Sequence, residues 1–179
     1  MIIPGFLISI LTFPGVIVHE MAHQIFCRIC GVAVFDVCYF RFGNPSGYVV
    51  HEIPKKASSN ILIGVGPFLV NSIVGALIAL PGALPIISLK GNVNYGFFEM
   101  FLIWLGVSIA MNAFPSTGDA KSMWKAIKGE NSSLLTKIIG TPIVGLIYLG
   151  AAGSVVWLDL FYGIGICALL PNIILNVMA

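Results

Sequence analysis

Long apolar runs separated by short polar segments dominate the pattern of this chain. Five of these runs meet the requirement of roughly 20 apolar residues for a helix that crosses a bilayer. Pro14 and Gly15 predict a kink or a break in the first run, and Pro171 predicts a bend in the last. The pattern predicts an all-α polytopic membrane protein with about five transmembrane helices, at about residues 4–29, 61–80, 95–114, 134–157 and 160–177.

The polar segments between the runs differ in character. Residues 33–53 are rich in β-branched and aromatic residues around a Gly-Asn-Pro-Ser-Gly turn, which predicts a small membrane-associated β-hairpin. Residues 81–94 carry Pro and Gly near both ends, which predicts a loop, re-entrant in one interpretation. Residues 120–131 are polar and space their lysines almost as a helix does, which predicts a short surface helix.

Composition supports the membrane interpretation. Hydrophobic residues make up 58% of the 179 residues and charged residues only 9%, whereas a soluble domain carries about 25% charge. Residues 1–179 therefore form a single integral membrane domain, with the lipid bilayer as its surroundings. The formal net charge of +2 is too small to indicate a nucleic-acid partner. Cys27 and Cys30 form a lone Cys-x-x-Cys pair, which we interpret as structural.

The basic residues predict the orientation of the chain. When the five runs are threaded alternately through a membrane, eight of the nine basic residues fall on one side and Lys90 falls on the other. Basic residues favour the cytoplasmic side, so we expect the N-terminus outside and the C-terminus in the cytoplasm. The hairpin and the turn at 112–119 would then share the cytoplasmic face. The eight residues are Arg28, Arg41, Lys55, Lys56, Lys121, Lys125, Lys128 and Lys137.

The first apolar run contains the motif with the strongest chemical signal, His19-Glu20-Met21-Ala22-His23. On a helix, His19 and His23 lie one turn apart on the same face, which is the spacing that two nitrogen ligands of one Zn²⁺ need. Glu20 follows the first histidine, where it can act as a general base beside the metal without binding it. A charged group in the bilayer costs roughly 2.5–3.5 kcal/mol, so such groups are normally retained for a function.

A catalytic zinc site needs a third protein ligand. Asp119 is the best candidate, because it lies just past the third run on the same predicted side as the histidines. It can instead be an ordinary helix cap at the start of the polar helix. The weaker candidates are His51, Glu52, Glu99, Glu130 and Asp159.

The combination of His19-Glu20-Met21-Ala22-His23, Gly66-Pro67 with Asn71, and Asn112-Ala113-Phe114-Pro115 before Asp119 resembles the site-2 protease family of intramembrane zinc metalloproteases. The resemblance covers about residues 5–125. It implies a catalytic core of three transmembrane helices with a β-structured segment after the first, and additional helices at about 134–177. It also implies Zn²⁺ held by His19, His23 and Asp119.

The function that the resemblance implies is cleavage within the transmembrane segments of other membrane proteins, the chemistry of regulated intramembrane proteolysis. Asn71 and Asn112 would donate hydrogen bonds to substrate or to a developing oxyanion; hydrogen bonding between helices is an equally good role for both. The sequence departs from the family pattern in two spacings. Asn71 stands one residue further from Gly66-Pro67 than usual, and Asp119 one residue closer to Pro115, with Ala120 where the family has glycine.

Two alternative functions remain open at the level of sequence. One is a non-catalytic relative that binds membrane helices. The other is a membrane zinc protease that acts on soluble or misfolded chains, with a glutamate as the third ligand.

Overall fold

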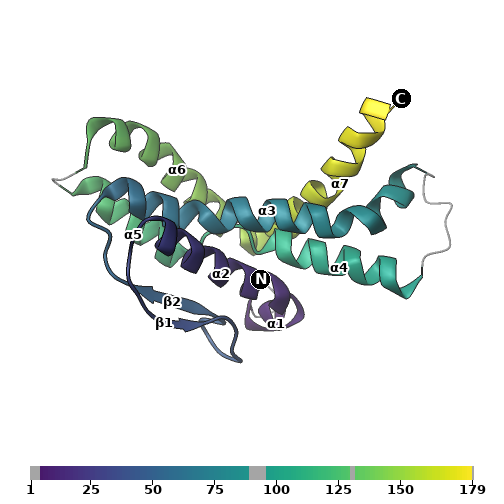
Figure 1. The fold of residues 1–179 in the computed structure, drawn as a ribbon, viewed down its shortest axis with the longest axis horizontal. Coiled ribbons are helices and arrows are strands. Elements are labelled where there is room, and N and C mark those ends of the chain that lie inside the picture. Colours follow the sequence, from purple (N-terminus) through teal and green to yellow (C-terminus); the bar gives the residue numbers. More distant parts are fainter. Residues whose placement is uncertain (1–4, 89–95, 130–131, 179) are drawn as a thin grey trace.

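The computed structural model describes residues 5–88, 96–129 and 132–178. Within these ranges the protein is mostly helical, with one two-stranded sheet. The longest helix is α3 (Ala57–Ser88), and the other elements are arranged along it (Figure 1). Helix α2 lies beside the first half of α3 and carries the sheet on its other side, whereas α4 and α7 lie beside the second half of α3.

The first apolar run forms two helices, α1 (Gly5–Leu11) and α2 (Phe13–Ile29). The break falls at Thr12, whose hydroxyl donates a hydrogen bond back to the carbonyl of Ile8 at 2.9 Å. Pro14 sits in the first turn of α2, where its missing N–H leaves no helical hydrogen bond unmade. The predicted break is therefore confirmed, slightly before Pro14.

The predicted hairpin is also confirmed. Strands β1 (Val34–Cys38) and β2 (Tyr48–His51) pair antiparallel, with Val37 opposite Val49. The Tyr39 hydroxyl donates to Gln24 Oε1 on α2 at 2.5 Å, which fastens the hairpin to that helix. The two elements meet closely at Gly47, where a Cβ atom would lie 2.7 Å from Cγ of Glu20.

The predicted loop at 81–94 is wrong for its first eight residues, because α3 continues through Pro81 and Pro85 to Ser88. The reason is the contact with α4 (Phe97–Met111): a Cβ atom on Gly82 would lie 2.6 Å from the carbonyl oxygen of Glu99. This close pairing stabilises the last turns of α3 although proline lacks a donor, as neighbouring helices commonly do for membrane helices. The rest of that loop, including Lys90, lies outside the described residues.

The chain ends in α5 (Thr117–Lys128), α6 (Leu134–Gly153), the 3₁₀ turn η1 (Ser154–Val156) and α7 (Leu158–Met178). Helix α5 confirms the short helix predicted from the lysine spacing. Helix α6 packs mainly on α5, and α7 packs on α3 and α4. The α5–α6 contact buries Ala120, Met123, Ile127, Val144 and Ile147.

Three stretches of the described chain are long and apolar enough to cross a membrane: Ala57–Ser88, Leu134–Val156 and Leu158–Val177. The five spans predicted from the sequence are not confirmed. Helices α2 and α4 have 17 and 15 residues and fall short of the length required. Helix α2 has one end near the middle of the molecule, and α4 runs between the middle and the side of the molecule where α3 ends (Figure 1).

Candidate metal site

The two histidines of α2 are each oriented by a backbone carbonyl. His23 is buried, and its Nδ1 lies 3.0 Å from the carbonyl oxygen of Ile63 on α3. Nδ1 of His19 lies 2.7 Å from the carbonyl oxygen of Asn112, just after α4. A carbonyl oxygen can only accept a hydrogen bond, so each ring carries a proton on Nδ1. In the neutral rings, the lone pair on each Nε2 is then available to bind a metal ion.

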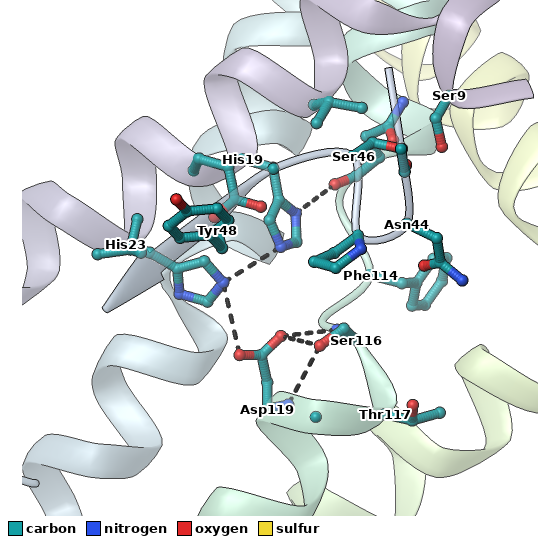
Figure 2. A pocket seen from close by; sticks show the side chains of 18 of the residues that line it. Ser9, His19, His23, Asn44, Ser46, Tyr48, Phe114, Ser116, Thr117 and Asp119 are labelled. Atoms are coloured by element: carbon teal, nitrogen blue, oxygen red, sulfur yellow. Dashed lines mark hydrogen bonds and ion pairs between the residues drawn. The ribbon is translucent and has the colours of Figure 1, made fainter. Parts of the chain in front are cut away.

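These two Nε2 atoms face one another and the Asp119 carboxylate (Figure 2). They are 3.2 Å apart, and Oδ1 of Asp119 lies 3.6 Å from Nε2 of His23. All three ligand atoms lie within 4.8 Å of one another. Two ligand atoms that each lie about 2.0–2.2 Å from a tetrahedral zinc ion are about 3.3–3.6 Å apart, and the observed 3.2 and 3.6 Å are close to that range.

A cation held between these atoms would be stabilised by all three of them. Two nitrogen lone pairs and a carboxylate oxygen would repel one another if nothing lay between them. A proton shared by the two Nε2 atoms, which are 3.2 Å apart, would relieve the repulsion between the rings, but 3.6 Å from His23 Nε2 to Asp119 Oδ1 is too long for a hydrogen bond to the carboxylate. The donor set, two imidazoles and one carboxylate, is one that zinc accepts in catalytic sites.

Asp119 serves two purposes with its two oxygens. Its Oδ2 accepts hydrogen bonds from the Ser116 backbone N–H at 2.8 Å and from the Ser116 hydroxyl at 2.6 Å. The Asp119 N–H donates to the Ser116 hydroxyl in return, at 3.1 Å, which completes a capping box at the start of α5. The cap and ligand roles that the sequence left as alternatives are therefore compatible, because the cap uses Oδ2 and leaves Oδ1 facing the histidines.

The carboxyl group of Asp119 is an anion in this setting. Burial by itself would raise the pKa of Asp119, but its interactions with His23 and His19 and the hydrogen bonds from Ser116 hold that pKa well below its usual value. An ionised carboxylate is the form that binds a metal ion.

Glu20 follows His19 on α2, and its side chain lines the same cavity as the three candidate ligands. Its Cγ lies against Gly47 in the hairpin turn, so the hairpin limits where its carboxylate can go. Within the described part of the chain, no hydrogen bond or ion pair fixes that carboxylate. Glu20 is therefore free to act on a molecule held in the cavity.

The cavity has a volume of about 920 Å³. Its walls come from α2, from the hairpin turn with β2, and from the segment 112–119, which joins α4 to the first turn of α5 (Figure 2). Helix α1 and η1 contribute one serine each. Cavities of about 300–1,000 Å³ commonly hold small molecules or short pieces of chain. Much of the lining is polar and uncharged, including Ser9, Asn44, Ser46, Thr117 and Ser154.

The two asparagines predicted to contact substrate, Asn71 and Asn112, donate their side-chain N–H groups to other groups of the protein. The Nδ2 atom of Asn71 lies 3.0, 3.1 and 3.2 Å from the carbonyl oxygens of Gly15, Ile109 and Asn112. Asn71 is fully buried and is not among the residues that line the cavity. Of the two roles that the sequence left open for it, these contacts favour hydrogen bonding that joins α2, α3 and the end of α4.

Asn112 lines the cavity, but its amide nitrogen donates to the carbonyl of Ser108 at 2.8 Å and to the hydroxyl of Thr12 at 3.1 Å. Its amide therefore has no free N–H for an oxyanion. Its main contribution to the site is the backbone carbonyl that binds His19. Sequence reasoning missed this carbonyl and that of Ile63, since backbone groups leave no sequence signal. The Ser-x-x-Asp spacing of a capping box would have identified Ser116.

The other candidate ligands lie elsewhere. His51 lines the cavity, but its Nδ1 lies 2.7 Å from the carbonyl oxygen of Glu52. Glu99 and Asp159 stand at the starts of α4 and α7, and Glu130 lies outside the described residues. Across the described ranges, one group of three His, Cys, Asp or Glu side chains is close enough together to hold a metal ion. It consists of His19, His23 and Asp119.

Comparison of the chain with models of protein families, with curated proteins and with solved structures finds no match.

Proposed function

We propose that this protein is an intramembrane zinc endopeptidase that hydrolyses peptide bonds in or near transmembrane segments of other membrane proteins. The observation that carries the proposal is the convergence of two histidine Nε2 atoms and one aspartate oxygen, with both Nδ1 atoms turned to backbone carbonyls. Metal-binding histidines commonly donate their second N–H to a carbonyl or a carboxylate, which orients the ring and strengthens the ligand. The His-Glu-x-x-His spacing and the resemblance to site-2 proteases support the same assignment.

Each side chain has a role in the proposed reaction. Zn²⁺, when bound, supplies Lewis acidity for a peptide carbonyl and for water. His19, His23 and Asp119 hold the ion, and Ser116 fixes the Asp119 carboxylate. Glu20 accepts a proton from water at its carboxylate and later donates it to the leaving amine. Removal of Glu20 should therefore abolish turnover without releasing the metal.

The hairpin gives the substrate a place beside the site. Strand β2 contributes Tyr48, Val49 and His51 to the cavity wall. A substrate helix has to unwind before it can be cut, and an extended segment can pair with the free edge of a strand through its main chain. We propose that the substrate lies along β2 as an extended segment, with its scissile bond near Glu20.

We further propose an orientation in which the N-terminus is outside, the C-terminus is cytoplasmic and the site faces the cytoplasm. The basic residues of α5 and of the segment before α3 would then meet the cytoplasmic surface. Helices α1 and α2 together, and the short helix α4, would supply the two spans beyond the three long apolar helices.

The test compares the membrane proteomes of cells that express the wild-type protein or the Glu20→Gln variant. Mass spectrometry of new protein termini should find cleavage within apolar segments in wild-type cells only. Glu99→Gln is the matched control, because Glu99 lies at the far end of α4 and should leave cleavage intact. Identical termini with wild type and Glu20→Gln would contradict the proposal. Termini confined to soluble segments would favour a protease of soluble or misfolded chains.

A further inference from the structure

The aromatic ring of Phe114 is held between three helices. Phe114 lies in the turn between α4 and α5, and its ring centroid is 4.9 Å from that of Tyr162 on α7 and 5.7 Å from that of Phe68 on α3. On the side of α6, a Cβ atom added to Gly150 would lie 2.6 Å from Cδ1 of Phe114. The ring therefore fits against a helix that has no side chain at this point.

Tyr162 is itself held in place. Its hydroxyl lies 2.7 Å from the hydroxyl of Ser72, and the Ser72 hydroxyl donates to the carbonyl of Phe68 at 2.5 Å. The rings of Tyr162 and Phe68 also contact each other, with centroids 5.5 Å apart. The three rings form one cluster, which we call the Phe114 cluster, made of Phe68, Phe114 and Tyr162. Because a hydrogen bond fixes Tyr162, the cluster gives Phe114 little freedom to move.

The position of Phe114 matters because the turn that carries it contacts the candidate metal site at both ends. Two residues before Phe114, the Asn112 carbonyl orients His19. Five residues after it, Asp119 directs Oδ1 toward His23. The neighbours of Phe114, Ala113 and Pro115, are buried, so the turn is packed on both sides of the ring. A displacement of the ring would therefore move the His19 carbonyl partner and the Asp119 carboxylate relative to the histidines.

We propose that Gly150 and Tyr162, on the two C-terminal helices, are positioning residues for the third metal ligand. They act through Phe114 and touch neither the metal ligands nor substrate. Helices α6 and α7 therefore help to position the metal ligands, and the helices before them do not form the site alone. This inference rests on the proposed metal site.

The test measures Co²⁺ binding by the purified full-length protein in detergent, because Co²⁺ in a tetrahedral site gives a visible absorption band that reports ligand geometry. Gly150→Ala should raise the dissociation constant for Co²⁺ by roughly ten- to a hundredfold, the range seen when outer partners of metal ligands are lost, and should change the absorption band. The matched control is Gly145→Ala on the same helix, where an added Cβ atom meets nothing within 4 Å. It should bind Co²⁺ as the wild type does.

A second change separates positioning from general damage to the fold. In the double variant Gly150→Ala/Phe114→Leu, a smaller side chain makes room for the added methyl group, so Co²⁺ affinity should recover above that of Gly150→Ala alone. Unchanged Co²⁺ affinity in Gly150→Ala, or no recovery of affinity in the double variant, would overturn the inference.

If Gly150→Ala does not fold, Co²⁺ binding by Tyr162→Phe tests the inference instead, since this variant keeps the ring and removes only the hydrogen bond to Ser72. It should weaken Co²⁺ binding a few-fold, and wild-type affinity would overturn the inference. A wild-type protein that binds no Co²⁺ or Zn²⁺ would instead overturn the proposed function, and this inference with it.

Discussion

The two halves of α3 are packed by different means. Its first half adds hydrogen bonds to its packing on α2 and α5: the Ile63 carbonyl accepts from His23, and Asn60 donates to Ser122 at 3.2 Å. Its second half meets α4 and α7 through small residues. A Cβ atom on Gly106 would lie 2.5 Å from the carbonyl oxygen of Gly75, so the backbones of α3 and α4 touch there without side chains between them.

This difference in packing distinguishes the first half of α3, which borders the candidate metal site, from the second half, which only holds helices together. Close contact of small residues is a general way to pair helices in lipid, where the hydrophobic effect does not drive association. Buried histidines and asparagines in apolar helices are costly and are normally retained for a function. Changes in the polar half should therefore affect metal binding and catalysis, whereas changes in the small-residue half should affect stability. The following predictions test this division, from the largest expected effect to the smallest.

The largest effect is expected for metal binding when a ligand is removed from the polar half. His23→Ala should weaken Zn²⁺ binding by more than about a hundredfold, since loss of even an outer-shell partner costs 10–100-fold. Competition with a chromophoric chelator measures this. His51→Ala is the control, because His51 lines the cavity but lies outside the candidate ligand group. If His23→Ala still bound Zn²⁺ tightly, the metal site would have to lie elsewhere than beside the first half of α3.

The next effect is expected for stability in the small-residue half. Gly106→Val places a side chain against the backbone of α3 and should lower the free energy of unfolding by about 1–3 kcal/mol or more, as overpacking does. Titration with a denaturing detergent measures it. Gly165→Val on α7 carries the same helix cost with open space around its Cβ atom, and should be much less harmful. If both variants lost the same free energy of unfolding, the close backbone contact between α3 and α4 would not be what stabilises this half.

A smaller effect, on both Zn²⁺ affinity and stability, is expected when Ser116 is replaced. Ser116→Ala removes a helix cap, which costs about 1 kcal/mol of stability. It also removes the hydroxyl hydrogen bond to the Asp119 carboxylate and leaves only the one from the Ser116 backbone N–H, which should weaken Zn²⁺ binding by up to roughly tenfold. Ser133→Ala is a matched control, because Ser133 caps α6 by accepting from the Thr136 N–H at 3.2 Å. Both variants should lose stability, and only Ser116→Ala should lose metal affinity. A parallel loss of affinity in both would assign Ser116 a purely structural role.

The smallest effect is expected at the hairpin. Tyr39→Phe removes the exposed hydrogen bond to Gln24 and should cost no more than about 1 kcal/mol of stability. Metal affinity should stay unchanged, while cleavage of a membrane substrate should fall a few-fold because β2 is held less firmly. Tyr148→Phe on α6 is the control. A drop in metal affinity in Tyr39→Phe would show that the hairpin belongs to the metal site itself.

Local sequence patterns predicted the elements of the site but not their connections. The spacing of His19 and His23 and their apolar setting pointed to one helix face, and the hairpin followed from its turn chemistry. The helix through Pro81 could not be read from local propensity, because the pairing of Gly82 with α4 overrides it. The three carbonyl partners of Asn71 could not be predicted, because they lie on backbone segments that only the fold brings together.

The contacts of Phe114 illustrate the same limit over a longer range. Gly150 and Tyr162 are 36 and 48 residues further along the chain, in helices that resemble any other apolar span. Nothing in their local pattern links them to Asp119. Only the packing of α6 and α7 around the turn makes that link.

The most direct test of the central claim is zinc-edge X-ray absorption on the purified full-length protein. The account predicts close to one zinc per chain, bound by nitrogen and oxygen ligands at about 2.0–2.2 Å, two of them imidazoles. His23→Ala should lower the zinc content, and the zinc that stays bound should show only one imidazole. A protein without zinc, or a zinc ion with sulfur ligands at about 2.3 Å, as a site at Cys27 and Cys30 would give, would contradict the account.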